Sequence, residues 1–277
     1  MSGRDPFAVL EPLARALLAE ALVATRRQSF ADATALPRHA RLAAALDAAL
    51  GGHAGGAAGN VDATARRIRD TAPALDPHVA LLLRCGRALP SVLAGEVAGT
   101  DLLFPRGTMD LVAPLYDGTE WSDRFNARLA EAAARAAVAL AAAGRRPVRV
   151  VEIGAGTGGT TRHVLPALAR AGVAVDYAYT DVSPGFLAHG RRRFPAVAGP
   201  ELRFAVLDIE RDPGGQGFAA GSADIVIATN VLHATARIAD SLGHVAAMLA
   251  PGGVALVNEI TRPSLFATMT FGLLDGW

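Results

Sequence analysis

The stretch VVEIGAGTGGTTRHVLPALA, Val150 to Ala169, carries the strongest structural signal in the sequence. An apolar run leads into a glycine-rich turn, and apolar residues at helical spacing follow the turn. This order predicts a buried strand, a tight turn and a helix. The turn satisfies the pattern G-x-G-x-x-G through Gly154, Gly156 and Gly159, and it satisfies G-x-G-x-G equally well through Gly158. Such a turn lets a ligand approach the backbone closely and meet the N-terminus of a helix.

Outward from this stretch, the two halves of the chain differ in pattern. After Pro147, five strand patterns alternate with helical ones, which predicts βαβ units and a parallel sheet. The strand patterns are VRVVEIG, AVDYAYTDVS, LRFAVLDIE, ADIVIATNVLHA and PGGVALVNEIT. The earlier part has Ala- and Leu-rich segments at helical spacing and no convincing strand. We therefore predict an α/β protein in which a helical N-terminal domain (1–145) precedes an α/β domain (146–277).

The composition excludes several classes of function. The formal net charge of +1 gives no overall field that would attract nucleic acid or anionic lipid. All 27 basic residues are arginine, which removes Schiff-base and P-loop lysines from consideration. The single cysteine, Cys85, excludes an internal disulfide and a cysteine-based zinc site, and we expect no metal. We find neither a signal peptide nor an apolar run long enough to span a membrane, so we expect a cytoplasmic protein.

Acidic residues stand at the ends of three successive predicted strands. Glu152, just before the glycine turn, would repel a pyrophosphate but suits a ligand with a positive amino group and a sulfonium. Asp181 is placed to accept hydrogen bonds from ribose hydroxyls, which a nicotinamide dinucleotide and S-adenosylmethionine both contain. Asp208 can accept from an adenine amino group, and Ile209 can pack on the ring. One such acid alone would more often be an ordinary solvated residue, but three at successive strand ends are a much less likely coincidence. Glu152 is the acid that favours S-adenosylmethionine over a nicotinamide dinucleotide.

Five motifs in order resemble a class I S-adenosylmethionine-dependent methyltransferase. They are EIGAGTGGTT, YTDVS, LDIE, DIVIATNVLHA and PGGVALVNEIT. More narrowly, they resemble the methyltransferase domains embedded in polyketide synthases and in mixed polyketide–peptide synthetases, and IATNVLHAT is typical of that branch. LFPRGT, LYDGTEWSDRFNARL and the terminal TFGLLDGW resemble the lid segments of this family. The resemblance, over roughly Leu89 to Trp277, implies a Rossmann-like sheet and makes the helical part a lid and substrate chamber.

The resemblance also implies the site residues. His233 follows the fourth predicted strand and Glu259 ends the fifth, and the family uses a His–Glu pair at these two motifs. His233 would be the general base and Glu259 would orient it. The alternative interpretation is a histidine that only caps a helix beside a solvated glutamate. By the same resemblance the cofactor is held by Gly154, Ala155 and Gly156 of the turn.

Two further residues are cofactor candidates. Asn230, in the loop after the fourth strand, would face the methionine moiety or a substrate carbonyl. Tyr116, in the lid segment, would close over the cofactor, or it would simply pack the domain junction. We read the run Arg191 to Arg193 as a solvated helix face rather than as a contact for an acidic carrier protein.

The function implied is methylation of the α-carbon of a β-ketoacyl thioester. The expected partners are an acyl carrier protein, which bears the phosphopantetheine-linked intermediate, and other synthase domains. Three alternatives stay open at this point: methylation of a β-hydroxyl or enol oxygen, an inactive structural relic, and a nicotinamide oxidoreductase.

The chain stops soon after the fifth predicted strand, whereas the class I sheet normally continues with two more strands. The final strands are therefore expected to be missing, which would leave an exposed sheet edge. We predict a protein that is marginally stable or self-associating in isolation.

Overall fold

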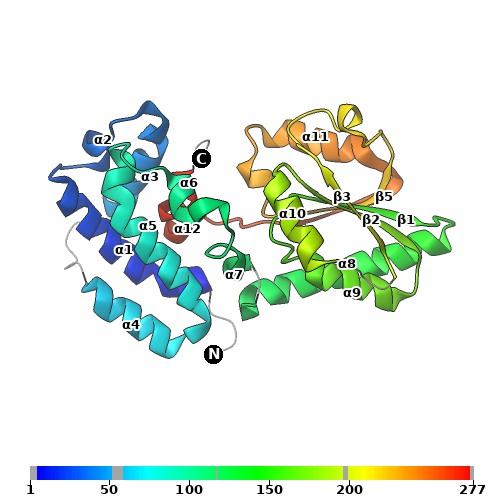
Figure 1. The fold of residues 1–277 in the computed structure, drawn as a ribbon, viewed down its shortest axis with the longest axis horizontal. Coiled ribbons are helices and arrows are strands. Elements are labelled where there is room, and N and C mark those ends of the chain that lie inside the picture. Colours follow the sequence, from blue (N-terminus) through cyan, green and yellow to red (C-terminus); the bar gives the residue numbers. More distant parts are fainter. Residues whose placement is uncertain (1–4, 52–58, 117, 196–198, 275–277) are drawn as a thin grey trace. The chain divides into compact units, whose positions relative to one another are not determined.

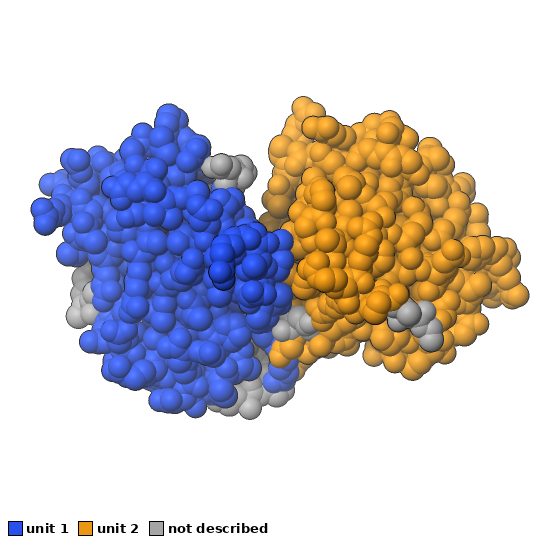
Figure 2. All heavy atoms as spheres, viewed as in Figure 1, with its two compact units in different colours: residues 1–115, 119–121, 261–277 blue, residues 116–118, 122–260 orange. Residues whose placement is uncertain are grey.

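The computed structural model describes residues 5–51, 59–116, 118–195 and 199–274 (Figure 1). The chain forms two compact units (Figure 2), each with its own core. The first comprises the described residues of 1–115, 119–121 and 261–277, and the second those of 116–118 and 122–260. The division lies ahead of the predicted boundary near residue 145, because the long helix α8 (Glu120–Ala142) packs on the sheet.

The first unit is helical throughout its described residues. Its helices are α1 (Pro6–Thr25), α2 (Phe30–Ala33), α3 (Ala40–Gly51), α4 (Val61–Thr71), α5 (Asp76–Leu93), α6 (Gly99–Leu103), α7 (Ala113–Tyr116, whose last residue belongs to the second unit) and α12 (Leu265–Met269). Local signals start several of them: Asp5 accepts a hydrogen bond from the Phe7 N–H at 2.9 Å, and Asn60 caps α4 in the same way. Leucines at helical spacing, such as Leu10, Leu13 and Leu17, fill the core.

The second unit is built on a parallel sheet of five strands. The strands are β1 (Val148–Ile153), β2 (Val175–Asp181), β3 (Glu201–Val206), β4 (Ala223–Thr229) and β5 (Leu249–Asn258), in the spatial order β3-β2-β1-β4-β5. All four neighbouring pairs are parallel, so the carboxyl ends of the strands share one edge. This confirms the predicted α/β fold with a helical region before a Rossmann-like sheet.

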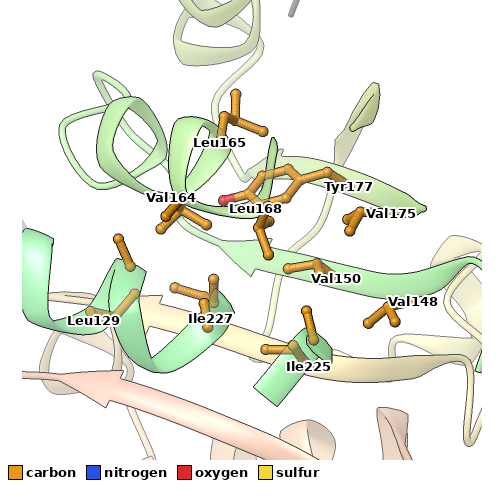
Figure 3. Packing of buried hydrophobic residues seen from close by; sticks show 14 of the residues in the cluster. Leu129, Val148, Val150, Val164, Leu165, Leu168, Val175, Tyr177, Ile225 and Ile227 are labelled. Carbon is orange, nitrogen blue, oxygen red and sulfur yellow. The ribbon is translucent and has the colours of Figure 1, made fainter. Parts of the chain in front are cut away.

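Helices α8, α9 (Thr161–Ala171) and α10 (Pro184–Arg193) cover one face of the sheet. Residues on α8 and α9 pack against inward-facing residues of the strands (Figure 3). Val150 on β1, Tyr177 on β2 and Ile227 on β4 all belong to this cluster, because alternate residues of a strand face the same side. The helix α10 covers the same face further along, where Leu187 packs on Tyr179.

The opposite face packs against α11 (Ile238–Met248). Val151 and Ile153 of β1 alternate with the residues of the first cluster and so face the other side of the sheet. They belong to a second cluster with Val245 and Met248 of α11. In the described part of the chain β5 pairs only with β4, so it is an edge of the sheet. Val257 of β5 is about half exposed. Whether this edge makes the isolated chain marginal or self-associating stays a prediction.

Candidate active site

The glycine turn adopts, at several positions, a left-handed conformation that glycine takes up without strain. Gly154, Gly156 and Gly158 have φ angles of +58°, +57° and +79°. Gly159 is required for another reason, since a Cβ atom there would lie 2.6 Å from the backbone oxygen of Tyr116. Both glycine patterns in the sequence therefore have a structural cause. A Cβ on Gly156 would meet only the Gly154 oxygen at 3.8 Å, so the turn opens to free space at this point.

Asp181 lies at the carboxyl end of β2, beside the turn. Its Oδ2 accepts a hydrogen bond from the Gly156 N–H at 3.0 Å, and its Oδ1 accepts from the Ser183 N–H at 2.8 Å. Burial raises the pKa of Asp181, although these N–H groups oppose the rise. The carboxylate thus holds the glycine turn and can also accept from a ligand, because each oxygen has more than one lone pair. Its ribose-binding role stays a prediction.

Glu152, the acid just before the glycine turn, is buried in the core. Its side chain is 1% exposed, and Oε2 accepts hydrogen bonds from Thr161 Oγ1 and Tyr177 OH, both at 2.6 Å. Burial raises the pKa of Glu152 to about 7. The carboxylate therefore joins β1 to β2 and to the first turn of α9, inside the core. A direct contact with a cofactor stays a prediction, and neither hydroxyl partner was singled out from the sequence.

Asp208 and Ile209 follow β3. Asp208 Oδ1 accepts from the Glu210 N–H at 3.0 Å, and Oδ2 lies 3.2 Å from Arg211 Nε. The side chain of Ile209 is buried in the core beneath α11, so little of it is available to an adenine ring. Val182, directly after Asp181, is 62% exposed and is a further candidate for an apolar contact with adenine, although no sequence motif marked it.

His233 and Glu259 are in contact. His233 Nδ1 lies 2.6 Å from Glu259 Oε2, although 26 residues separate them. The other carboxylate oxygen, Oε1, accepts from the N–H groups of Val231 at 2.8 Å and Leu232 at 2.7 Å. Adjacent parallel strands β4 and β5 produce this meeting, because both residues follow paired strand ends. The interpretation of His233 as a mere helix cap, beside a solvated glutamate, does not fit this geometry.

The contact between His233 and Glu259 favours the charged form of each side chain. The hydrogen bond to Glu259 raises the pKa of His233 against the opposing effect of burial. Burial alone would raise the pKa of Glu259, but the hydrogen bonds from His233, Leu232 and Val231 leave it below its usual value. His233 is about half exposed (53%) while Glu259 is only 16% exposed. A buried carboxylate thus orients a histidine whose ring reaches the surface.

Asn230 and Thr229 form the start of the turn that carries His233. Asn230 has a φ of +53°, and its N–H donates to the Asn258 oxygen at 2.8 Å, so the chain bends sharply after β4. Thr229 Oγ1 is buried without a hydrogen-bond partner in the described structure. This unpaired hydroxyl and the open space at Gly156 both fit a polar ligand at this edge. Thr229 was not among the predicted site residues.

Tyr116, the predicted lid residue, packs on the glycine turn through its backbone. The buried Asn126 links the two: Thr160 Oγ1 donates to Asn126 Oδ1 at 3.0 Å, and Asn126 Nδ2 lies 3.4 Å from the Tyr116 oxygen. Burial and, second, the negative charge of Glu259 raise the pKa of Tyr116, so its phenol stays protonated. Ala155 is buried behind the turn, where its N–H donates to the Thr180 oxygen.

The described residues contain neither a metal-binding group nor a membrane-spanning helix. Within them, no group of three or more His, Cys, Asp and Glu side chains is arranged to hold a metal ion. Of the helices they form, none is long and apolar enough to cross a membrane. Two histidines outside the pair with Glu259 also have partners: His163 Nε2 lies 3.2 Å from Asp123 Oδ1, and His244 Nδ1 lies 2.7 Å from the Ile209 oxygen.

Comparison with known proteins identifies the class. Residues 151–255 match the model of a family described as a methyltransferase domain. The chain is 34% identical to the solved DszA carbon methyltransferase, with a TM-score of 0.85 over 98% of this chain and 76% of that one. It is 28% identical, with a TM-score of 0.75 over 99% of this chain and 78% of that one, to the trans-methyltransferase CalH, which was solved with SAH. The chain is a class I S-adenosylmethionine-dependent methyltransferase.

Within that class the chain belongs to the methyltransferase domains of polyketide synthases. It is 46% identical over 253 residues to the polyketide synthase ThaG of Burkholderia thailandensis, a match that covers 87% of this chain and 4% of ThaG. The chain therefore spans only a small part of the synthase that it matches. The family assignment excludes the nicotinamide oxidoreductase that the glycine pattern alone had left open.

Proposed function

We propose that this domain methylates the α-carbon of a β-ketoacyl thioester carried on an acyl carrier protein. The observation that carries the proposal is the contact between His233 and Glu259 at the carboxyl edge of the sheet. The similarity to a protein titled a carbon methyltransferase supports carbon rather than oxygen as the acceptor. The much greater length of ThaG supports other synthase domains as partners.

His233 is suited to act as the general base. Its Nδ1 faces the Glu259 carboxylate, which fixes the tautomer in which Nδ1 carries the proton and Nε2 has a free lone pair. A proton between a ketone and a thioester is acidic enough for an imidazole to remove. His233 Nε2 takes that proton, the electron pair is left on the α-carbon as an enolate, and Glu259 stabilises the imidazolium.

The cofactor would lie along the turn that follows β1. The backbone of Gly154, Ala155 and Gly156 would hold it, with Asp181 at the ribose and Asp208 at the adenine. Tyr116 and Asn230 would bound the methionine end. When bound, S-adenosylmethionine supplies an electrophilic methyl group to the enolate carbon and leaves as S-adenosylhomocysteine.

Mass spectrometry of the product tests the proposal. The domain is incubated with S-adenosylmethionine and a β-ketobutyryl carrier protein, and the released acyl group is fragmented to locate the new methyl group. A methyl group on the α-carbon is expected, and one on oxygen would show that the acceptor was assigned wrongly. Total inactivity of the wild type would favour the inactive relic.

A second measurement isolates the base. In D₂O with S-adenosylhomocysteine in place of the methyl donor, the wild-type domain should exchange the α-proton of the same substrate for deuterium. His233→Ala should lose at least about a hundredfold in exchange rate, which is the usual contribution of a general base. His163→Gln serves as the matched control, because His163 lies on α9 and pairs with Asp123.

A further inference from the structure

Three consecutive residues of the glycine turn are each contacted by a different side chain from β2 or from the end of α10. Tyr179 contacts Gly156, Arg193 contacts Thr157, and Phe194 packs on Gly158. We propose that Tyr179 and Arg193 are positioning residues that hold the turn in its cofactor-binding shape before the cofactor arrives. The proposal rests on the assignment of the cofactor to this turn and is independent of the acceptor substrate.

The contact of Tyr179 is short and enclosed. Its hydroxyl donates to the Gly156 oxygen at 2.6 Å. The ring is fully buried, with the Phe204 ring centroid at 5.2 Å and the Phe194 centroid at 6.2 Å. Gly190 of α10 lies so close that a Cβ there would be 2.8 Å from the Tyr179 ring. Burial raises the pKa of Tyr179, so the phenol remains a hydrogen-bond donor at any working pH.

Arg193 supplies the neighbouring contact. Its Nη1 donates to the Thr157 oxygen at 2.8 Å, and its guanidinium lies 5.5 Å from the centre of the Phe194 ring. That ring in turn occupies the place of a side chain on Gly158, since a Cβ there would be 2.5 Å from Phe194 Cε2. Arg193 therefore faces the turn rather than a solvated helix face.

The other arginines of the run behave differently. Arg191 is exposed, lies 5.3 Å from the centre of the Phe204 ring and points toward β3. Arg192 is also exposed, and the structure gives it no contact with the turn in the described residues. The sequence RRR thus contains one residue that faces the turn and two that are exposed, which the sequence pattern alone could not separate.

Fixing the turn in advance lowers the cost of binding. Left-handed glycines are unusually free in conformation, so an unsupported turn would lose much entropy when a ligand orders it. Holding the oxygens of Gly156 and Thr157 fixes the orientation of the two peptide planes that follow these residues. The N–H of Gly158, in the second of these planes, donates to the Ala155 oxygen at 2.9 Å within the turn. The cofactor therefore meets a turn that is already ordered.

The test uses the full chain and two single variants, Tyr179→Phe and Arg193→Met. Each is expected to weaken the binding of S-adenosylhomocysteine about five- to tenfold by titration calorimetry, the usual effect of one lost hydrogen bond. In the cofactor-free protein, amide hydrogen exchange across residues 154–160 should accelerate. The methylation rate at saturating S-adenosylmethionine should hardly change, and Arg193→Lys should recover part of the affinity. The matched control is Arg192→Met, the neighbouring exposed arginine, which should behave as the wild type does.

Two results would overturn the proposal. One is unchanged exchange in the turn in both variants. The other is exchange that rises equally through β1, β2 and α9, which would mean that these side chains support the whole fold and not the turn. If the wild type fails to bind S-adenosylhomocysteine, the assignment of the cofactor to this turn fails, while the exchange measurement in the cofactor-free protein still tests the positioning role.

Discussion

Two loops at the same edge of the sheet are held in place in different ways. The glycine turn after β1 (154–160) accepts hydrogen bonds from Tyr179 on β2 and Arg193 on α10, and it donates one to Asp181 at the end of β2. The turn after β4 (230–235) depends on one carboxylate, Glu259, which accepts from Val231, Leu232 and His233. Several side chains from other segments hold the first loop. In the described structure the second loop is held from outside by the backbone contact of Asn230 with Asn258 and by one side chain, Glu259, which is also the partner of its histidine.

This difference fits the roles proposed for the two loops, since the first would bind the cofactor and the second would carry the base. A loop that only has to hold a cofactor loses part of its affinity when one contact is removed, because the other contacts still hold most of its shape. A loop that must aim a base needs its orienting carboxylate for both position and proton affinity. The two loops meet where Gly154 faces Val231, since a Cβ on Gly154 would lie 2.5 Å from Val231 Cγ2.

Removal of the Glu259 carboxylate should have the largest effect. We expect Glu259→Ala to reduce the methylation rate about a thousandfold, because His233 loses its orienting partner and two N–H groups lose their acceptor. The Kd for S-adenosylhomocysteine should change only a few-fold. Steady-state kinetics and calorimetry on the same preparation check both values. An equal loss of affinity and rate would show that the two loops are not separable in this way.

A substitution at the meeting point should disturb both loops. Gly154→Ala places a methyl group against Val231 and at a φ of +58°, so we expect cofactor affinity to fall between about ten- and a hundredfold. Calorimetry with S-adenosylhomocysteine measures the loss. The double variant Gly154→Ala/Val231→Ala should recover part of it, because the steric conflict is relieved while the backbone strain remains. If the second change recovers nothing, strain in the backbone accounts for the whole effect.

The pH dependence of the rate sharpens the role of Glu259. His233 must be neutral to accept a proton, and its pKa is raised above 6.5, so kcat/KM should climb with pH and level off above the ordinary histidine range. In Glu259→Gln the carboxylate charge is lost, and the midpoint should move down toward the ordinary histidine value. A pH profile of kcat/KM with a small thioester substrate measures this. A midpoint common to both proteins would contradict the coupling.

Substitution of Glu152, the buried acid before the glycine turn, should affect the stability of the fold more than the methylation rate. The pKa of Glu152 is about 7 in the folded protein against 4.5 in the unfolded chain. The folded state then binds more protons between these values, so this group lowers stability as pH rises from 4.5 to 7. In Glu152→Gln this contribution disappears. We therefore compare the free energy of unfolding of the variant with that of the wild type at two pH values. This difference, variant minus wild type, should be more positive at pH 8 than at pH 5 by roughly 1–3 kcal/mol.

Thermal and urea unfolding of the cofactor-free proteins at the two pH values measure this difference. Thr161→Val is a useful companion, because it removes one donor to the carboxylate and should raise the pKa of Glu152 further. If the difference in free energy of unfolding between Glu152→Gln and the wild type is the same at pH 5 and pH 8, Glu152 does not titrate between these pH values in the folded core.

The sequence by itself determined the parts of the protein that depend on local pattern. The five strands appear where apolar runs follow turn residues, and Gly154, Gly156 and Gly158 have the left-handed conformations that a glycine motif suggests. The family resemblance implied the pairing of His233 with Glu259, and the neighbouring parallel strands β4 and β5 bring the two residues together at one edge.

Only the tertiary structure decided where the other polar side chains point. Glu152 turns into the core toward Tyr177 because residue alternation places both on the face covered by α9. Arg193 reaches the glycine turn although its two neighbours in the sequence do not, since its helical position alone faces Thr157. The place of α8 in the second unit depends on burial of its alanines against the sheet. These outcomes come from packing between distant segments, and no local pattern in the sequence encodes them.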